Sequence, residues 1–162
     1  MFFLIIFISF ILDFLFNFVF FDSIFLPLIV FVSLIFLEPY FIKDKYKYYL
    51  CSFLVGFFYD LVYTGYYFMN AGLFLIVAIL VVFINRLTPN NFVVSFLETV
   101  LLIIFYRFLS FIFLVLNGVV FFDFKIFFEC VYSSLILNVL YGSFLYLFLC
   151  FISKKFKLKR ID

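Results

Sequence analysis

The chain consists of long apolar runs that are separated by short groups of polar residues. A helix needs roughly 20 apolar residues to cross a hydrocarbon core of about 30 Å. Cutting the sequence at its polar groups predicts six membrane helices, over residues 2–21, 24–37, 48–64, 66–85, 92–116 and 126–152. The second run has 14 residues, with Pro27 in its first turn, and as a helix it rises only about 21 Å. The pattern therefore predicts six spans, or five if the second run does not cross.

The composition places this chain in a membrane. It has 162 residues, of which 70% are hydrophobic and 12% are charged. A soluble domain is typically about half apolar, because charged side chains must cover its core. The balance here excludes a water-soluble globule, and at about 100–200 residues per domain the length leaves no room for a separate soluble catalytic domain. We expect an all-α polytopic membrane protein in which residues 1–162 form a single integral membrane domain.

The basic residues predict the side of the membrane on which each loop lies. Six spans place nine Lys and Arg residues on the side of both termini and Lys125 alone on the other, with Arg107 inside a span. Cytoplasmic loops carry such an excess of Lys and Arg. Both termini are therefore predicted to be cytoplasmic. The loops on the other side are predicted to be short, at 22–23, 65 and 117–125.

A basic cytoplasmic tail, residues 153–162, follows the last predicted helix. Such a run typically anchors a last helix at the anionic leaflet, at about 1 kcal/mol per basic residue. Docking of a cytoplasmic protein is the alternative interpretation. The expected cytoplasmic basic residues, besides Arg86, are Lys43, Lys45, Lys47, Lys154, Lys155, Lys157, Lys159 and Arg160.

Polar and small residues recur every four positions on three of the predicted helices. In lipid such residues mark the faces on which helices pack, and glycines permit close approach of two backbones. A spacing of i, i+4 and i+8 keeps the side chains on one face of a helix. These stripes are Ser9, Asp13 and Asn17 on the first helix, Ser52, Gly56, Asp60 and Thr64 on the third, and Cys130, Ser134, Asn138, Gly142 and Tyr146 on the sixth.

Three ionisable residues lie deep inside predicted spans, where a charge needs a partner. Asp13 and Asp60 are roughly 17–18 Å from the cytoplasmic ends of their helices, and Arg107 is about 22 Å from its own. We therefore expect Arg107 to pair with Asp60, with a contribution from Asp13. A buried ion pair that fixes helix register is the favoured interpretation. The alternatives are a binding site for a partner's membrane helix and a proton or ion pathway, which the absence of His disfavours.

The residue types argue against catalysis. The chain has no His, and Cys51, Cys130 and Cys150 lie far apart among apolar residues. That spacing matches neither a metal site nor a disulfide framework. The sequence also has neither the motifs of intramembrane proteases nor a Gly-rich phosphate-binding loop. We expect no enzymatic activity, no cofactor, no metal and no nucleic-acid partner.

The segment GFFYDLVYT, from Gly56 to Thr64, resembles the signature of the rod shape-determining protein MreD family. That signature is a Gly, three residues, an Asp–apolar pair and a small-residue turn before the next helix. Members also have five or six spans, a basic end, and a last helix with two small residues followed by Asn, as at 133–134 and Asn138 here. The resemblance covers residues 48–85 and 126–160. The sequence MNAG at 69–72 departs from the family, which usually has a Leu followed by one Gly there.

This resemblance implies a non-catalytic subunit of the machinery that elongates the cell wall, located in the bacterial plasma membrane. Members of the family bind the bitopic protein MreC and work with the MreB filament and cell-wall synthases such as RodA, directly or indirectly, among membrane lipids. The resemblance implies a role in bundle integrity or partner contact for Gly56 and Asp60. The depth of Arg107 adds that residue, and the helix-packing stripe adds Ser134, Asn138 and Gly142.

The alternative function is that of the substrate-binding subunit of an energy-coupling-factor vitamin transporter, whose fold the MreD fold is thought to resemble. Such subunits usually dock through an Ala-x-x-x-Ala stripe in the first helix, whereas residues 2–21 here contain no Ala. They also enclose a ligand in an extracytoplasmic pocket, which the short predicted loops would barely cap. An unassigned small membrane protein, such as a holin-like or immunity protein, is the third interpretation. We favour the cell-wall subunit.

Overall fold

The computed structural model describes residues 2–19, 27–41, 44–64, 66–89 and 91–156, except for the side chains of 64 and 154–156. These residues form helices and no strands. The α-helices are α1 (Phe2–Val19), α2 (Ile29–Leu37), α3 (Lys45–Tyr59), α4 (Met69–Leu87), α5 (Phe92–Leu116) and α6 (Phe124–Phe156). A 3-10 turn, Glu38–Tyr40, follows α2, and a π-helical turn, Asp60–Thr64, continues α3.

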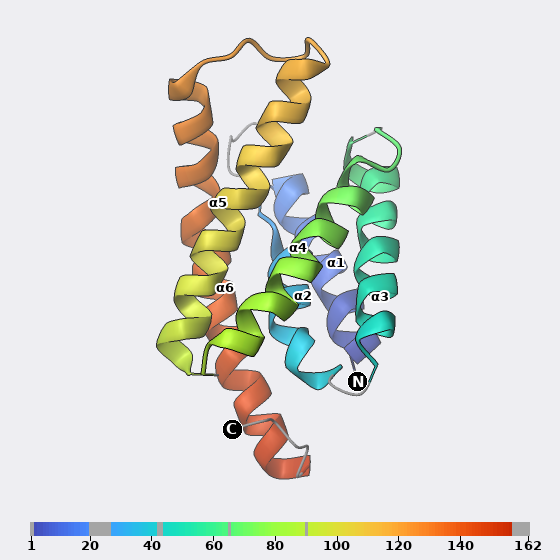
Figure 1. Cartoon of the computed structure of the whole chain (residues 1–162), viewed down its shortest axis with the longest axis vertical. Helices are drawn as coiled ribbons and strands as arrows, with labels where there is room; N and C mark the ends of the chain where they lie inside the picture. The colour runs from blue at the N-terminus through green and yellow to red at the C-terminus, as the bar shows by residue number, and fades with distance from the viewer. Residues whose placement is uncertain (1, 20–26, 42–43, 65, 90, 157–162) are drawn as a thin grey trace.

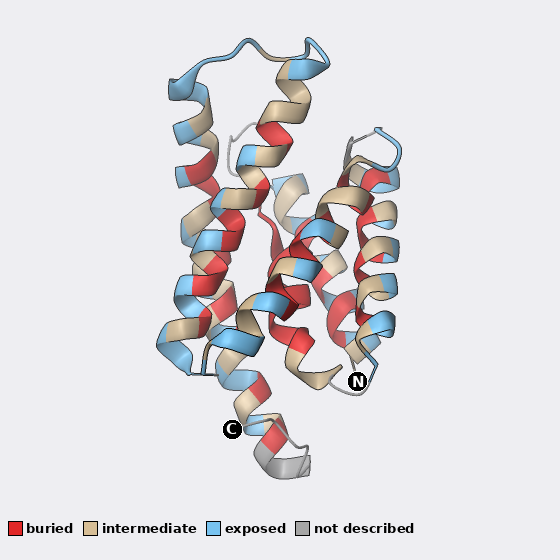
Figure 2. Cartoon of the chain, in the orientation of Figure 1, coloured by how far each residue is buried: buried red, intermediate tan, exposed pale blue. Residues whose placement is uncertain are grey.

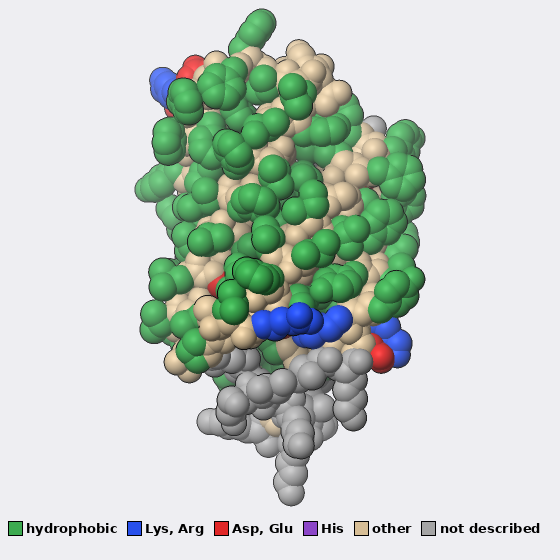
Figure 3. Space-filling view, in the orientation of Figure 1, with side chains coloured by type: hydrophobic (Ala, Val, Ile, Leu, Met, Phe, Trp, Pro, Cys, Tyr) green, Lys and Arg blue, Asp and Glu red, His purple; other side chains and the backbone are tan. Residues whose placement is uncertain are grey.

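The helices run alternately up and down in one bundle (Figure 1). Helices α1, α3 and α5 begin at the lower end in this view, where α2, α4 and α6 end. We call this the basic end, because Lys45 and Lys47 in the first turn of α3 and Arg86 in the last turn of α4 lie there. A band of hydrophobic side chains covers most of the visible face above it (Figure 3).

Four helices in the described part of the chain are long and apolar enough to cross a membrane. They are α1, α4, α5 and residues Phe124–Ser153 of α6. Helix α2 has 9 residues and α3 has 15, although the π turn extends α3 by 5 more. The chain therefore has the architecture of a helical membrane protein, and six crossings with cytoplasmic termini stay a prediction.

The short second helix forms the centre of the bundle. All nine residues of α2 are buried, and the helix begins near mid-height (Figures 1 and 2). The ring of Phe31 lies 5.4 Å from that of Phe74 on α4 and 4.8 Å from that of Tyr106 on α5, between ring centroids. Because α2 is apolar apart from Ser33, it requires neighbours on every side, and α1, α4, α5 and α6 provide them.

Some predicted helix boundaries were wrong. The second helix begins at Ile29 and not at 24, so Pro27 precedes it and does not lie in its first turn. The predicted start at 126 is at Phe124, because Asp123 Oδ1 accepts a hydrogen bond from the Lys125 N–H at 2.8 Å and caps the helix. The loop before α6 is therefore 117–123, two residues shorter than predicted.

The remaining predicted spans differ from the helices chiefly at their ends. The span 92–116 agrees with α5. The span 48–64 corresponds to α3 and its π turn, which begin three residues earlier, at Lys45. The span 66–85 corresponds to α4, which begins and ends later, and α6 ends later than the predicted 152. The counting of apolar residues misses helical turns that carry polar residues, such as the Lys-rich start of α3. The other two short loops predicted, at 22–23 and 65, lie outside the described residues.

Candidate functional site

A carboxylate on one helix holds the start of the next. Asp60, at the start of the π turn, is 1% exposed. Its Oδ1 accepts hydrogen bonds from the backbone N–H (3.0 Å) and side-chain amide (2.8 Å) of Asn70, and its Oδ2 accepts one from the Ala71 N–H (3.0 Å). The N-cap residue of α4, Phe68, makes no side-chain cap. Asp60 therefore satisfies N–H groups that lack a partner within α4, where the helix dipole also favours a negative charge.

A close backbone contact accompanies this cap. Gly56 lies one turn before Asp60 on α3, and a Cβ atom placed on it would be 2.5 Å from the carbonyl oxygen of Asn70 and 2.8 Å from the Cα of Ala71. Real Cβ atoms do not approach backbone atoms so closely. Gly56 thus allows the backbones of α3 and α4 to come close together where Asp60 accepts hydrogen bonds from the first turn of α4. The two residues form a single joint, which we call the α3–α4 joint.

The same arrangement occurs between α1 and α2. Asp13, with a fully buried side chain, accepts hydrogen bonds from the backbone N–H groups of Ile29 on Oδ1 (3.0 Å) and Val30 on Oδ2 (2.9 Å). Asn138 Oδ1 on α6 accepts a third from the Leu28 N–H at 2.7 Å. The backbone N–H groups at the start of α2, in the interior of the bundle, thus find their acceptors on two other helices. We call this cluster the α1–α2 joint.

Hydroxyl groups join the same three helices further toward the basic end. The Oγ atoms of Ser9 on α1 and Ser33 on α2 are 2.7 Å apart, and the Tyr141 hydroxyl on α6 lies 3.0 Å and 2.9 Å from them. Next to Tyr141, Gly142 faces α2, where an added Cβ would be 3.0 Å from the ring of Phe36. The small and polar stripes of α1 and α6 therefore face α2. Helix α2 has no such stripe of its own, so the sequence did not identify it as the helix on which the other two pack.

Arg107, on α5, contacts α6. Its Nε donates a hydrogen bond to Ser134 Oγ at 3.3 Å, and its guanidinium carbon is 6.0 Å from the ring centroid of Tyr106. Tyr106 in turn donates to Asn70 Oδ1 at 2.5 Å, which connects α5 to the α3–α4 joint. The expected pairing of Arg107 with Asp60 stays a prediction.

An acidic residue that sequence reasoning did not single out organises the basic end. Glu38 is 2% exposed, forms an ion pair with Lys45, and accepts a hydrogen bond from the Asn85 side-chain amide at 2.8 Å. Lys47 makes an exposed pair with Asp44 at 2.6 Å. Of the other predicted basic residues, Lys43, Lys157, Lys159 and Arg160 lie outside the described residues, as do the side chains of Lys154 and Lys155.

A cavity of about 520 Å³ lies in the half of the bundle away from the basic end. Residues of α1, α3 with its π turn, α4 and α5 line it. Its wall is rich in tyrosine and also contains Arg107. The tyrosines are Tyr59, Tyr63, Tyr66 and Tyr106, and the amide side chains are those of Asn17 and Asn70. The polar lining makes this cavity the candidate ligand site of the chain.

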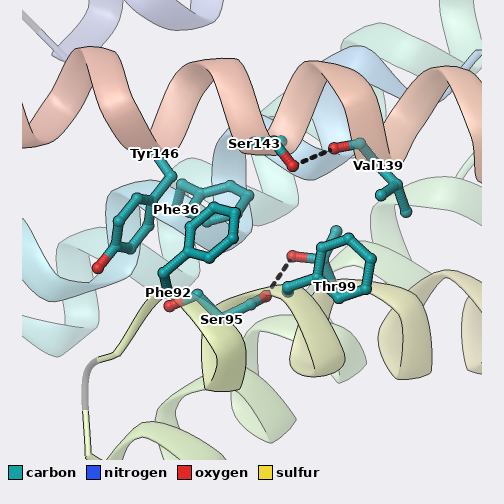
Figure 4. Close-up of a pocket in the computed structure, with 9 residues that line it drawn as sticks. Phe36, Phe92, Ser95, Thr99, Val139, Ser143 and Tyr146 are labelled. Atoms are coloured by element: carbon teal, nitrogen blue, oxygen red, sulfur yellow. Dashed lines mark hydrogen bonds between the residues drawn. The ribbon is translucent and has the colours of Figure 1, made fainter.

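A second, smaller groove between α5 and α6 has an aromatic wall (Figure 4). The Tyr146 ring lies 5.2 Å from that of Phe92 and 6.3 Å from that of Phe36, between centroids. The hydroxyl of Thr99 donates to its own helix at Ser95 O (2.7 Å), as that of Ser143 does at Val139 O (2.9 Å). These hydrogen bonds stay within each helix, so the groove presents mainly aromatic and aliphatic groups.

Within the described residues, no group of three or more His, Cys, Asp or Glu residues could hold a metal ion. Cys51, Cys130 and Cys150 are free and half-buried. Comparisons with known proteins add no further assignment: no protein family, no curated protein and no solved structure matches this chain.

Proposed function

We propose that this chain is a non-catalytic integral membrane subunit of the machinery that elongates the bacterial cell wall, and that it supports rod shape by binding an MreC-like bitopic protein. In this proposal it connects the MreB filament to the peptidoglycan synthases, directly or indirectly. It is a multi-pass protein of the plasma membrane with both termini in the cytoplasm. The observation that carries the proposal is the position of the Gly56–Asp60 motif in the α3–α4 joint.

The joint supports a structural role for this motif. Both carboxylate oxygens of Asp60 accept hydrogen bonds from the first turn of α4, and Gly56 contacts the backbone of that turn. A carboxylate held in this way fixes the geometry of a helix pair. The resemblance of this motif to the MreD signature, described above, connects the joint to a subunit whose task is to present helix faces to partners.

The surface supports contact through helices. The described loop before α6 is short, and large apolar side chains cover the outer faces of the helices, for example Phe58 (55% exposed) and Leu140 (65% exposed). Helix association in lipid relies on packing and on buried polar contacts. A bitopic partner with one membrane helix would therefore meet this chain mainly through apolar faces of the bundle.

Purification from the native membrane tests this function. The tagged full-length protein is extracted in mild detergent, and the proteins that accompany it are identified by mass spectrometry. We expect a bitopic coiled-coil protein and cell-wall synthases. Gly56→Ala should reduce their recovery, while Gly72→Ala, at a site with open space around it, should not. Recovery of ATPase subunits in place of these partners would contradict the proposal.

One observation favours the alternative function of a vitamin-transporter subunit. The cavity of about 520 Å³ lies in the half of the bundle that the charge distribution predicts to be extracytoplasmic, and it has a polar, aromatic wall. A transporter subunit requires such a pocket. The same purification distinguishes the two functions, because a transporter subunit would be recovered with ATPase subunits and a bound water-soluble vitamin.

A further inference from the structure

The cavity of about 520 Å³ between α1, α3, α4 and α5 runs from the helix ends into the middle of the bundle. At the helix ends its lining includes Asn17, two residues before the end of α1, and Met69, the first residue of α4. At mid-height its lining includes Tyr106, near the middle of α5. The cavity therefore extends inward from the end of the bundle that is opposite the basic end (Figure 1).

The exposure of the wall falls from the outer end of the cavity to the inner end. Val62 is 56% exposed and Tyr66 is 37% exposed, whereas Tyr59 and Tyr106 are buried. Tyr66 lies in the link between the π turn and α4, and tyrosine is enriched where membrane helices meet water. The cavity thus has its mouth at the helix ends and its floor inside the bundle.

Polar side chains occur along the whole depth of the wall. Asn17 contributes an amide near the mouth, and Ser110 and Arg107 contribute a hydroxyl and a guanidinium further in. Cavities that stay dry in proteins are lined by apolar groups, whereas a polar cavity holds water once it offers about 10–15 Å³. At about 520 Å³ this cavity is far larger than that limit. Its size and lining therefore favour water over hydrocarbon.

Arg107 gives a physical reason for water at this depth. A guanidinium stays charged in proteins, and charged groups inside membrane helices face polar partners or a water-filled cavity. Arg107 donates to Ser134 Oγ at 3.3 Å and interacts electrostatically with the buried carboxyl of Asp13, and it also lines the cavity. This position combines protein partners on one side with an open wall on the other, as expected of a charge that water also reaches.

We propose that this cavity is an aqueous vestibule, which admits water and small hydrophilic solutes to the level of Arg107 and excludes the acyl chains of lipids. The vestibule opens at the end of the bundle opposite the basic end, which the charge distribution predicts to be extracytoplasmic. The proposal is independent of the cell-wall function, because access of a reagent to the vestibule and recovery of protein partners are separate measurements.

Cysteine labelling of the full-length protein in lipid nanodiscs tests the vestibule. Ser110→Cys places a thiol on the wall, and Ser52→Cys places one at a fully buried serine outside it; both hydroxyls donate to their own helix. Leu140→Cys, at a residue 65% exposed near the middle of α6, presents a thiol to the lipid. A thiol reacts as its thiolate, which apolar surroundings disfavour. With a charged, water-soluble methanethiosulfonate we expect Ser110→Cys to react at least tenfold faster than either control.

A second wall position keeps the test independent of one variant. Leu114→Cys lies on the wall one turn nearer the end of α5 and should react faster still than Ser110→Cys. Peptide mass spectrometry identifies the modified residue, so the three native cysteines stay in place, and thermal unfolding midpoints establish that each variant is folded. Wall cysteines that react as slowly as Leu140→Cys, or only with a lipid-soluble maleimide, would show that hydrocarbon fills the cavity and overturn the proposal. Reaction of Ser52→Cys as fast as that of the wall cysteines would also overturn it.

Discussion

Asp13 and Asp60 make the same contact in two successive helix pairs. Each carboxylate lies on the earlier helix and accepts hydrogen bonds from two consecutive backbone N–H groups at the start of the later one. In hydrocarbon an unsatisfied backbone group costs several kcal/mol, so both carboxylates replace water that a soluble protein would use there. The donors are Ile29 and Val30 for Asp13, and Asn70 and Ala71 for Asp60.

Removal of one carboxylate should loosen the helix that it holds. Asp13→Ala leaves the N–H groups of Ile29 and Val30 without this acceptor. Hydrogen bonds to charged groups contribute about 1.5–3 kcal/mol each, so we expect a loss of about 3 kcal/mol or more in the free energy of unfolding in detergent. Hydrogen-exchange mass spectrometry should show faster exchange at the start of α2. Glu129→Ala, at an exposed acidic residue of α6, is the control and should change neither quantity.

Two glycines of the same helix pair should respond in opposite ways to alanine. Gly56→Ala places a Cβ 2.5 Å from the Asn70 carbonyl oxygen, so α3 and α4 must separate and the Asp60 cap must lengthen. We expect a loss of about 1–3 kcal/mol, typical of overpacking. Gly72→Ala adds a Cβ in open space within α4 and should gain up to about 1 kcal/mol from helix propensity. Chemical unfolding of both variants in one detergent measures the contrast, and equal effects would contradict the close approach at Gly56.

The predicted pairing of Asp60 with Arg107 can be measured by a double-mutant cycle. Asp60→Ala alone should destabilise the protein, and adding Arg107→Ala should cost less than it does in the wild-type background, because the charge it balances is already gone. The free energies of unfolding of the four proteins, measured in the same detergent, give the coupling. Losses that add within about 0.5 kcal/mol would show that the two residues act independently.

The hydroxyl cluster predicts a modest and local effect. Tyr141→Phe removes the group that lies 3.0 Å from Ser9 Oγ and 2.9 Å from Ser33 Oγ. A neutral hydrogen bond contributes about 1 kcal/mol, so we expect a loss of about 1–2 kcal/mol in the free energy of unfolding. Tyr132→Phe, at a residue of α6 that is 67% exposed, is the matched control and should have little effect. If the Tyr141→Phe variant is as stable as this control, the hydroxyl cluster does not stabilise the protein.

The spacing of polar residues predicted much of the interior. The stripes on α1, α3 and α6 supply Asp13, Asp60 and Asn138 to the two joints, and the small residue Gly56 lies where two backbones meet. These positions can be predicted from the sequence because small and polar side chains are scarce on lipid-facing surfaces and are common where membrane helices pack. The predicted all-helical architecture was therefore correct for the described residues.

The partners of these residues could not be read from the sequence. Asp13 and Asp60 bind backbone N–H groups, which every residue carries and no side-chain pattern marks. The start of α2 depends on contacts from α1 and from the distant α6, so an apolar run alone placed it too early. Phe68, just before α4, has a φ of 66°, a conformation that bulky residues rarely adopt and that no propensity predicts.

The contact between Leu28 and Asn138 sets an order of events during biosynthesis. The two residues are 110 positions apart, and the Asn138 side chain accepts the Leu28 N–H at 2.7 Å. At a translation rate of about 5–20 residues per second, the ribosome needs roughly 5–20 s to reach Asn138 after it has made Leu28. During that interval the start of α2 lacks this acceptor. We therefore expect nascent chains that end before Asn138 to remain open to quality-control proteases, and α6 to close the bundle as its last step.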